Sequence, residues 1–117
     1  MVALAHTAAT FATRSWDVVL DGIFGPWFLP TIAAELRPTR LAVEYAVLRA
    51  PLEATLARVR ARSGHGRDHV VRQMHGQFAQ LGAYERHVVD AADRGPADLL
   101  ADVTRRRAAG AFLLDLA

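Results

Sequence analysis

Short apolar runs of strand length alternate with helix-like stretches along this chain of 117 residues. Continuous apolar runs that end at turn residues predict strands covered on both faces, whereas apolar residues three and four apart predict helices. The strand-like runs are Asp17–Asp21, Leu41–Leu48 and His87–Asp90. Strands separated by helices are joined by right-handed crossovers and lie parallel in one sheet. The alternation therefore predicts an α/β domain with three parallel strands near Val18–Asp21, Tyr45–Arg49 and Val88–Asp90.

Five helices are expected around these strands. The first has a predicted apolar stripe of Leu4, Ala8 and Phe11, and Asp68 is a suitable N-cap for the fourth. The glycines of the stretch 63–68 predict a flexible loop before that fourth helix. The helices are expected at Val2–Thr13, Trp27–Leu36, Pro51–Arg62, from Asp68 to Gly82, and after Gly95-Pro96.

Composition excludes several kinds of chemistry. The chain has no cysteine, which excludes disulfides and thiolate metal sites. All fourteen basic residues are arginine, so no lysine can hold a phosphate or form a Schiff base. A net charge of +2 does not by itself argue for nucleic acid. His65 and His69 are four apart, but the neighbouring glycines disfavour a helix through His65 and no Glu completes a His-Glu-x-x-His pattern, so no metal site is predicted.

No membrane or secretion signal is apparent. No apolar run approaches the roughly 20 residues that span a bilayer. The first basic residue is Arg14, so the positively charged start of a signal peptide is missing. The sequence predicts a cytoplasmic protein that does not enter a membrane.

Asp21 and Gly22 end the first predicted strand. Ligands of parallel α/β sheets bind beyond the carboxyl ends of strands. At such a place the Asp21 carboxylate could contact a ligand, and Gly22 would let the backbone come close to it. Asp is also a common turn former, so a purely structural role at Asp21 stays open. Trp27, which follows this turn, either lines a pocket or packs in the core.

Three arginines surround the predicted loop. Arg58 and Arg62 are four apart, so they share a helix face, which is predicted to point away from the sheet and toward the loop at Gly64–Gly66. Arg67 follows in the loop itself. Guanidinium groups bind phosphate oxygens in a bidentate manner, and the three could form a phosphate clamp. The alternative is a solvated helix face with Glu53 as a partner.

Several stretches of the sequence occur in the same order as in a known protein family and resemble it. They are Asp-Val-Val-Leu-Asp-Gly-Ile, Phe-Gly-Pro-Trp-Phe-Leu, Val-Leu-Arg-Ala-Pro-Leu-Glu with the arginine-rich helix that follows, Met-His-Gly-Gln-Phe and His-Val-Val-Asp. From about residue 4 to 100, the chain resembles the carboxyl-terminal part of P-loop kinases, namely bacterial small-molecule kinases such as gluconate kinase, shikimate kinase and chloramphenicol phosphotransferase. The resemblance implies a three-layer α/β/α fold in a single domain, residues 1–117, with a lid-like loop at about 63–68.

The resemblance also implies site residues. Asp21 falls where the family positions magnesium or substrate, and Arg58 and Arg62 fall where the lid helix supplies arginines to the transferring phosphates. Arg67 falls in the lid. Gly22, Phe24 and Trp27 border the implied acceptor-substrate pocket. ATP and magnesium are the implied cofactors, and a small molecule is the implied substrate.

One departure from the family limits this expectation. No Gly-x-x-x-x-Gly-Lys-Ser/Thr loop occurs in the sequence, so the backbone cradle, the lysine and the magnesium-binding hydroxyl are missing. The resulting expectation is a truncated, kinase-like domain whose parental activity is ATP-dependent phosphorylation, with no turnover by this chain alone. The alternative is a non-catalytic remnant that acts as a binding or interaction module. Unpaired strand edges predict homo-oligomers, and a natural start upstream of Met1 is expected.

Overall fold

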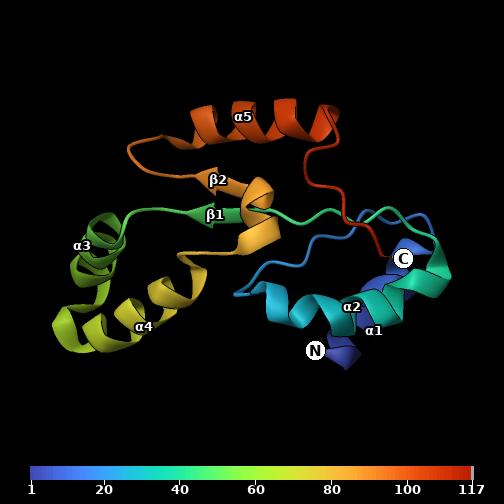
Figure 1. Ribbon diagram of the computed structural model, residues 1–117, viewed down its shortest axis with the longest axis horizontal. Helices are drawn as coiled ribbons and strands as arrows, with labels where there is room; N and C mark the ends of the chain where they lie inside the picture. The colour runs from blue at the N-terminus through green and yellow to red at the C-terminus, as the bar shows by residue number, and fades with distance from the viewer. Residues whose placement is uncertain (117) are drawn as a thin grey trace. The chain divides into compact units, whose positions relative to one another are not determined.

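The computed structural model describes residues 1–116, which form two compact units. Unit 1 comprises Met1–Glu44 and the carboxyl-terminal residues from Leu113, and unit 2 comprises Tyr45–Phe112. Helices and parallel strands together confirm a mixed α/β chain (Figure 1). None of the helices in the described part of the chain is long and apolar enough to cross a membrane.

Unit 1 is built on a pair of packed helices. Its α-helices are α1 (Val2–Ala12) and α2 (Leu29–Leu36), and its 3-10 turns are η1 (Pro26–Phe28) and η2 (Arg37–Thr39). Helices α1 and α2 pack against each other (Figure 1). Three alanines of α1 are buried against this interface, and the larger apolar residues of α2 supply the opposite side: Ala5, Ala8, Ala9, Leu29, Ile32 and Leu36.

The bounds of α1 and α2 agree with the predicted helices, but the predicted stripe of α1 is wrong. Leu4 is 41% exposed and Phe11 is 52% exposed, whereas Ala5 is fully buried. Alanine lets two helices approach closely, and the packing therefore selects the small side chains of α1 rather than its larger ones. Phe11 instead makes an edge contact with Trp16, at 6.5 Å between ring centroids.

The strand predicted at Asp17–Asp21 is wrong. These residues form neither a strand nor an isolated bridge, and Val19 is 87% exposed. A strand requires a neighbour for its backbone groups, and the segment has none within the described residues. The only bridge in unit 1 within that part of the chain is antiparallel and joins Glu44 to Leu113.

Unit 2 contains the sheet. It comprises two parallel strands, β1 (Val47–Arg49) and β2 (Val88–Asp90), paired in the register Val47↔Val88 (Figure 1). The described part of the chain therefore has two strands where three were predicted. The helical elements are α3 (Leu52–Ser63), η3 (His65–Arg67), α4 (Asp68–Phe78), η4 (Gly82–His87) and α5 (Pro96–Ala108).

The core of unit 2 is small. Its buried side chains come from both strands, from α3 and from the segments that flank β2 and α5; they are Val47, Leu56, Leu81, His87, Val89, Ala91 and Phe112. Neither α4 nor α5 contains a fully buried residue. The buried apolar side chains of this unit thus come in equal number from the two strands with α3 and from the flanking segments.

The helix boundaries of unit 2 follow the sequence signals with two corrections. Helix α3 begins directly after Pro51, and α5 begins at Pro96, as expected for proline in a first turn. Asp68 is the first residue of α4 rather than its N-cap, and its carboxylate pairs with Arg60 of α3. Helix α4 ends at Phe78, four residues before Gly82.

Gly64 ends α3 in a backbone conformation that disfavours other residues. Its φ is 72° and its ψ is −162°, and its N–H donates to the carbonyl of Arg60 at 2.8 Å. We expect Gly64→Ala to lower the free energy of unfolding by about 1–3 kcal/mol, because this region is almost exclusive to glycine. Urea denaturation monitored by far-UV circular dichroism is the measurement.

Gly66→Ala is the matched control for this prediction. A Cβ at either glycine would meet no atom within 4 Å, but only Gly64 has a positive φ. The difference between the two variants therefore isolates backbone strain. Equal urea midpoints for the two variants would show that the loop accommodates a side chain at Gly64 without strain.

Candidate functional site

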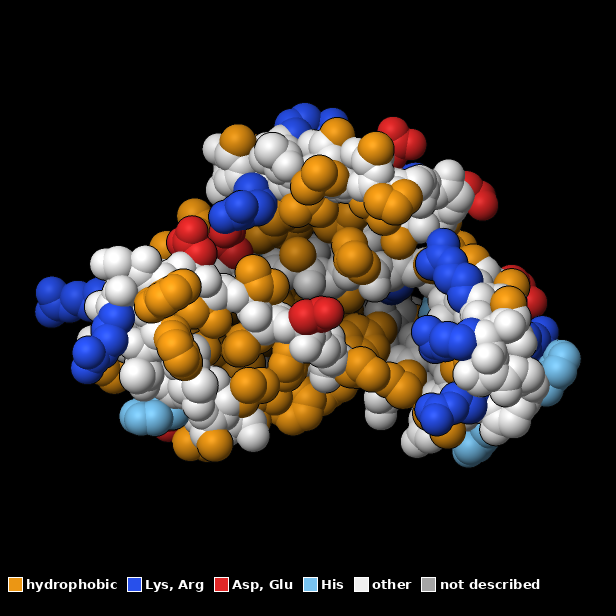
Figure 2. Space-filling view, turned by 180° about the vertical axis from the view of Figure 1, so that it is seen from behind, with side chains coloured by type: hydrophobic (Ala, Val, Ile, Leu, Met, Phe, Trp, Pro, Cys, Tyr) orange, Lys and Arg blue, Asp and Glu red, His pale blue; other side chains and the backbone are white. Residues whose placement is uncertain are grey.

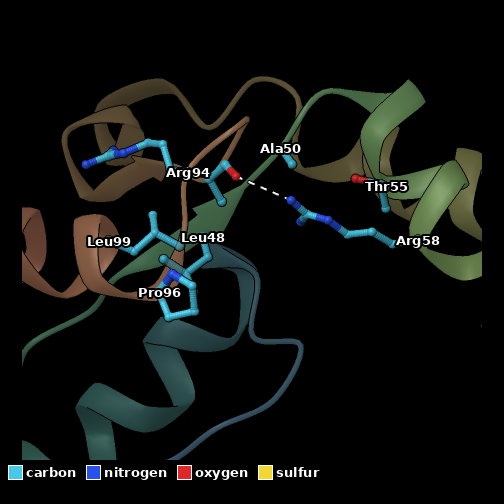
Figure 3. Close-up of a pocket in the computed structure, with 8 residues that line it drawn as sticks. Leu48, Ala50, Thr55, Arg58, Arg94, Pro96 and Leu99 are labelled. Atoms are coloured by element: carbon cyan, nitrogen blue, oxygen red, sulfur yellow. Dashed lines mark hydrogen bonds between the residues drawn. The ribbon is translucent and has the colours of Figure 1, made fainter.

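The carboxyl ends of β1 and β2 open into a hollow of about 520 Å³ within unit 2 (Figure 3). This is the edge at which open α/β sheets bind ligands. Residues at and beyond the end of each strand, the first two turns of α3 and the first turn of α5 line the hollow. They are Leu48, Ala50, Thr55, Arg58, Ala91, Arg94, Pro96 and Leu99.

Arg58 is the charged group that extends from α3 toward the strand ends. Its guanidinium donates to the carbonyl of Ala91 at 3.5 Å, the contact drawn as a dashed line in Figure 3. No carboxylate pairs with Arg58 within residues 1–116. Arg58 therefore lies in the hollow, is only weakly held, and has donors available for an anion.

The predicted direction of Arg58 is wrong. Residue spacing placed Arg58 and Arg62 together, facing the loop at Gly64–Gly66 and away from the sheet. The structure instead directs Arg58 toward Ala91 at the end of β2. Arg62 is exposed one turn later on α3 and makes no such contact within the described residues. Helical spacing shows that Arg58 and Arg62 start from the same face of α3. The long arginine side chain can still turn toward a nearby hydrogen-bond acceptor, which for Arg58 is the carbonyl of Ala91.

Arg94 is the second guanidinium in the hollow, and it is fully engaged. Its Nη1 donates to the Asp102 carboxylate at 3.0 Å and to the carbonyl of Asp90 at 2.9 Å. The Arg94 guanidinium holds the pKa of the Asp102 carboxyl below its usual range. Figure 3 shows the Arg94 side chain pointing away from Arg58. Arg94 thus fixes the β2–α5 connection rather than offering free donors.

A second ion pair stabilises the end of β1. Arg49 donates to both oxygens of Glu85 at 2.8 Å and to the carbonyl of Phe78 at 2.9 Å. Glu85 also accepts the Leu81 N–H at 3.0 Å. The Arg49 contact, followed by the Leu81 N–H, lowers the pKa of Glu85. His75 of α4 contacts the carbonyl of Ala50 at 2.9 Å. These bonds hold α4 and η4 at the strand end.

The predicted lid is anchored by a pair that the sequence analysis did not identify. Arg60 donates to the Asp68 carboxylate at 2.6 Å, which joins α3 to α4 across the loop. This contact lowers the pKa of Asp68. Arg67 is exposed in η3. Basic side chains gather on the face formed by α3 and α4 (Figure 2). Arg60 and Asp68 are eight residues apart in the sequence, and their pair joins two helices across a turn. Spacing along a single helix therefore could not predict this contact.

Asp21, Gly22, Phe24 and Trp27 belong to unit 1, and Arg58, Arg62 and Arg67 belong to unit 2. The predicted site residues thus divide between the two units. Asp21 and Gly22 are exposed. Phe24 contacts Phe28 edge to face, with ring centroids 6.5 Å apart.

Trp27 packs on its own turn. Its ring centroid lies 6.1 Å from that of Phe28, and a Cβ at Gly25 would lie 2.2 Å from the indole. The indole therefore covers Gly25, where only a hydrogen fits. Trp27 is nevertheless 49% exposed.

Two of the histidines in unit 2 contact other groups. His65 lies 3.7 Å from the Asp68 carboxylate, and His75 is engaged with a backbone carbonyl. Within residues 1–116, no three His, Asp or Glu side chains are grouped as metal ligands would be. A scan against protein-family models and a search of curated proteins found no match to this chain.

Proposed function

We propose that this chain is a P-loop-kinase-like unit that binds a phosphorylated or otherwise anionic small molecule at the carboxyl edge of β1 and β2. Its parental activity is ATP-dependent phosphorylation of a small molecule. The observation that carries the proposal is Arg58, a guanidinium in the hollow with no carboxylate partner in the described residues. Phosphoryl transfer depends mainly on positioning and on neutralising phosphate charge, which such an arginine provides.

The surroundings of Arg58 support an anion at this place. Helices α3 and α5 both begin at this edge, and the amino-terminal end of a helix carries a partial positive charge. The Thr55 hydroxyl, which also lines the hollow, donates to the carbonyl of Pro51 at 3.2 Å, so its proton is engaged by the helix backbone. Within this proposal Arg62 and Arg67 act as the outer, lid-side cations. Asp21, in unit 1, keeps only the role that the resemblance implies, meeting magnesium or the acceptor, and is not placed in this hollow.

The chain alone is expected to bind Mg-ATP poorly and to show no kinase turnover. The glycine-rich phosphate loop, its lysine and its hydroxyl do not occur in the sequence. Those groups normally enclose the β- and γ-phosphates and hold the metal. Calorimetry with Mg-ATP that gave low-micromolar binding at a stoichiometry near one would contradict this expectation.

Arg58→Ala is expected to weaken binding of tripolyphosphate by about tenfold, since a charge-assisted hydrogen bond contributes about 1.5 kcal/mol. Amide chemical shifts near Thr55 and Ala91, followed by NMR during the titration, report the binding. Arg72→Ala is the matched control, because Arg72 is an exposed arginine on α4 that does not line the hollow. Equal losses in the two variants would indicate nonspecific attraction to a basic surface.

The alternative is a non-catalytic remnant that acts as a binding or interaction module. Two further arginines at this edge favour it: Arg49 and Arg94 are both occupied by carboxylates. In a site that retained catalysis, more than one guanidinium group would be unpaired and able to bind the phosphates. Tripolyphosphate binding that Arg58→Ala does not weaken would support this alternative.

A further inference from the structure

Positive charge is concentrated in unit 2 and, within it, on α3, η3 and α4. Unit 2 has eleven arginines and seven acidic side chains, whereas unit 1 has three arginines and five acidic side chains. Between Glu53 and Glu85 the chain has five arginines and a single carboxylate, that of Asp68. Basic side chains gather over α3 and α4 (Figure 2). The net charge of +2 for the whole chain therefore conceals a markedly basic surface on one unit.

Most arginines of unit 2 are engaged by the unit itself. Four pair with carboxylates and three donate to backbone carbonyls; in this order they are Arg49, Arg60, Arg94, Arg105, Arg58, Arg86 and Arg106. Three exposed arginines make neither a hydrogen bond nor an ion pair within residues 45–112, all of which the structure describes: Arg62, Arg67 and Arg72. They lie between the last turn of α3 and the second turn of α4, and together they form an arginine surface.

An ion pair holds the two helices of the arginine surface together. Arg60 donates to the Asp68 carboxylate at 2.6 Å, which joins the end of α3 to the start of α4. The hydrogen bond from Arg60 lowers the pKa of Asp68, and the nearby charges of Arg60, His65 and Arg72 lower it further. The one carboxylate of this stretch is thus already paired, so the arginine surface retains its positive charge.

The arrangement suits a row of phosphates rather than a single one. Arg67 directly precedes α4 and Arg72 lies in its second turn, so about 7 Å of helix separates the two residues. Arg62 lies on the other side of the η3 turn, on α3. Guanidinium groups spread over two helices in this way can each donate to the oxygens of a different phosphate.

The residue types favour double-stranded nucleic acid over other polyanions. Residues 58–77 contain no Phe, Trp or Tyr, so the arginine surface has no ring on which unpaired bases would stack. Val70 is the only large apolar side chain exposed on α3 and α4, whereas helices that lie on membranes insert several, including Trp, Phe or Leu. A duplex backbone requires only hydrogen-bond donors and positive charge.

We propose that the arginine surface binds the phosphate backbone of double-stranded nucleic acid. The contacts are charge-assisted hydrogen bonds from Arg62, Arg67 and Arg72 to phosphate oxygens. Binding releases counterions condensed on the duplex, so the affinity falls steeply as the salt concentration rises. None of the three arginines lines the hollow at the strand ends, and the proposal needs no small anion bound there.

Fluorescence anisotropy of a labelled duplex oligonucleotide measures binding by the full chain. With three phosphate contacts, the logarithm of the association constant should fall against the logarithm of the salt concentration with a slope of about −3. Arg67→Gln and Arg72→Gln should each weaken binding at low salt by about threefold and reduce the size of that slope by about 1. Both side chains are exposed and unpaired within unit 2, so folding should be retained, and circular dichroism checks this.

Arg105→Gln is the matched control. Arg105 is an exposed arginine of the same unit on α5, and its partner Asp102 keeps a second ion pair with Arg94. The affinity for the duplex and the salt slope should both be unchanged in this variant. Equal losses from Arg105→Gln and Arg72→Gln would overturn the proposal, and so would the absence of any anisotropy change at low salt.

Competition separates duplex from other polyanions. The labelled duplex is displaced with unlabelled duplex, with one of its strands alone, with phosphatidylserine vesicles and with polyglutamate, compared at equal total charge. We expect unlabelled duplex to be the most effective of the four competitors. A single strand, the vesicles or polyglutamate displacing the duplex more effectively would overturn the proposal and assign the arginine surface to that partner.

Discussion

Replacing Leu56 with alanine is expected to lower the free energy of unfolding by about 2–5 kcal/mol. Leu56 is fully buried and is the one buried residue of α3. The small core of unit 2 has no spare side chain to fill the resulting cavity. Whole domains have a free energy of unfolding of only about 5–15 kcal/mol, so this single change removes a large fraction of the total stability.

Urea denaturation of the two proteins measures the effect, and Leu100→Ala is the control. Leu100 is 67% exposed on α5, so the same chemical change there should alter the free energy of unfolding by less than about 0.5 kcal/mol. If Leu56→Ala cost no more than Leu100→Ala, Leu56 would not be a buried core residue of unit 2.

The second large effect is a loss of stability in acid caused by His87. This side chain is fully buried just before β2, and its Nδ1 lies 2.7 Å from the carbonyl of Tyr45. The ring packs against those of Tyr45 and Tyr84, at centroid distances of 5.5 Å and 5.8 Å. Its Nε2 is buried without a hydrogen-bond partner in the described residues. Protonation would therefore place an unsatisfied charge in the core.

Burial lowers the pKa of His87, and the nearby positive charges of Arg86 and Arg106 lower it further. The hydrogen bond to the Tyr45 carbonyl opposes these effects. Because the folded-state pKa lies below the unfolded value of about 6.5, the unfolded chain takes up the proton first. This contribution to stability is complete above about pH 6.5 and is lost as the pH falls below it.

His87→Gln tests this expectation. Glutamine can still donate a hydrogen bond to the Tyr45 carbonyl but does not titrate. Urea midpoints measured between neutral and mildly acidic pH should fall more steeply for the natural chain than for the variant. Parallel pH profiles of the two proteins would show that another group is responsible for acid sensitivity.

The helices and the two strands of unit 2 were predictable because their signals are local. Proline at the start of α3 and α5, and apolar runs at β1 and β2, needed no knowledge of the rest of the chain. The Asp17–Asp21 segment shows the limit of such signals. Its residues favour a strand, but a strand also requires a neighbour, and no local pattern reports whether one exists.

The candidate site was predictable only in part, for a similar reason. Arg58 was found from its spacing and its place after β1. Its bond to Ala91 depends on how β2 packs beside β1, 33 residues away in the chain. Arg94 was missed because its role depends on Asp102 in the following helix. The residue types in a sequence identify side chains that can bind anions. Tertiary contacts determine which of these side chains are already paired with a carboxylate of the protein.

The division into two units has a spectroscopic consequence. Both tryptophans, Trp16 and Trp27, lie in unit 1, whereas both tyrosines, Tyr45 and Tyr84, lie in unit 2. Tryptophan emission excited at the red edge of its absorption therefore reports unit 1 alone. The near-ultraviolet dichroism of the tyrosines, which pack around His87, reports the core of unit 2. The native chain thus contains a separate optical probe for each half, and a single denaturation series without labels can reveal whether the halves unfold together or in sequence.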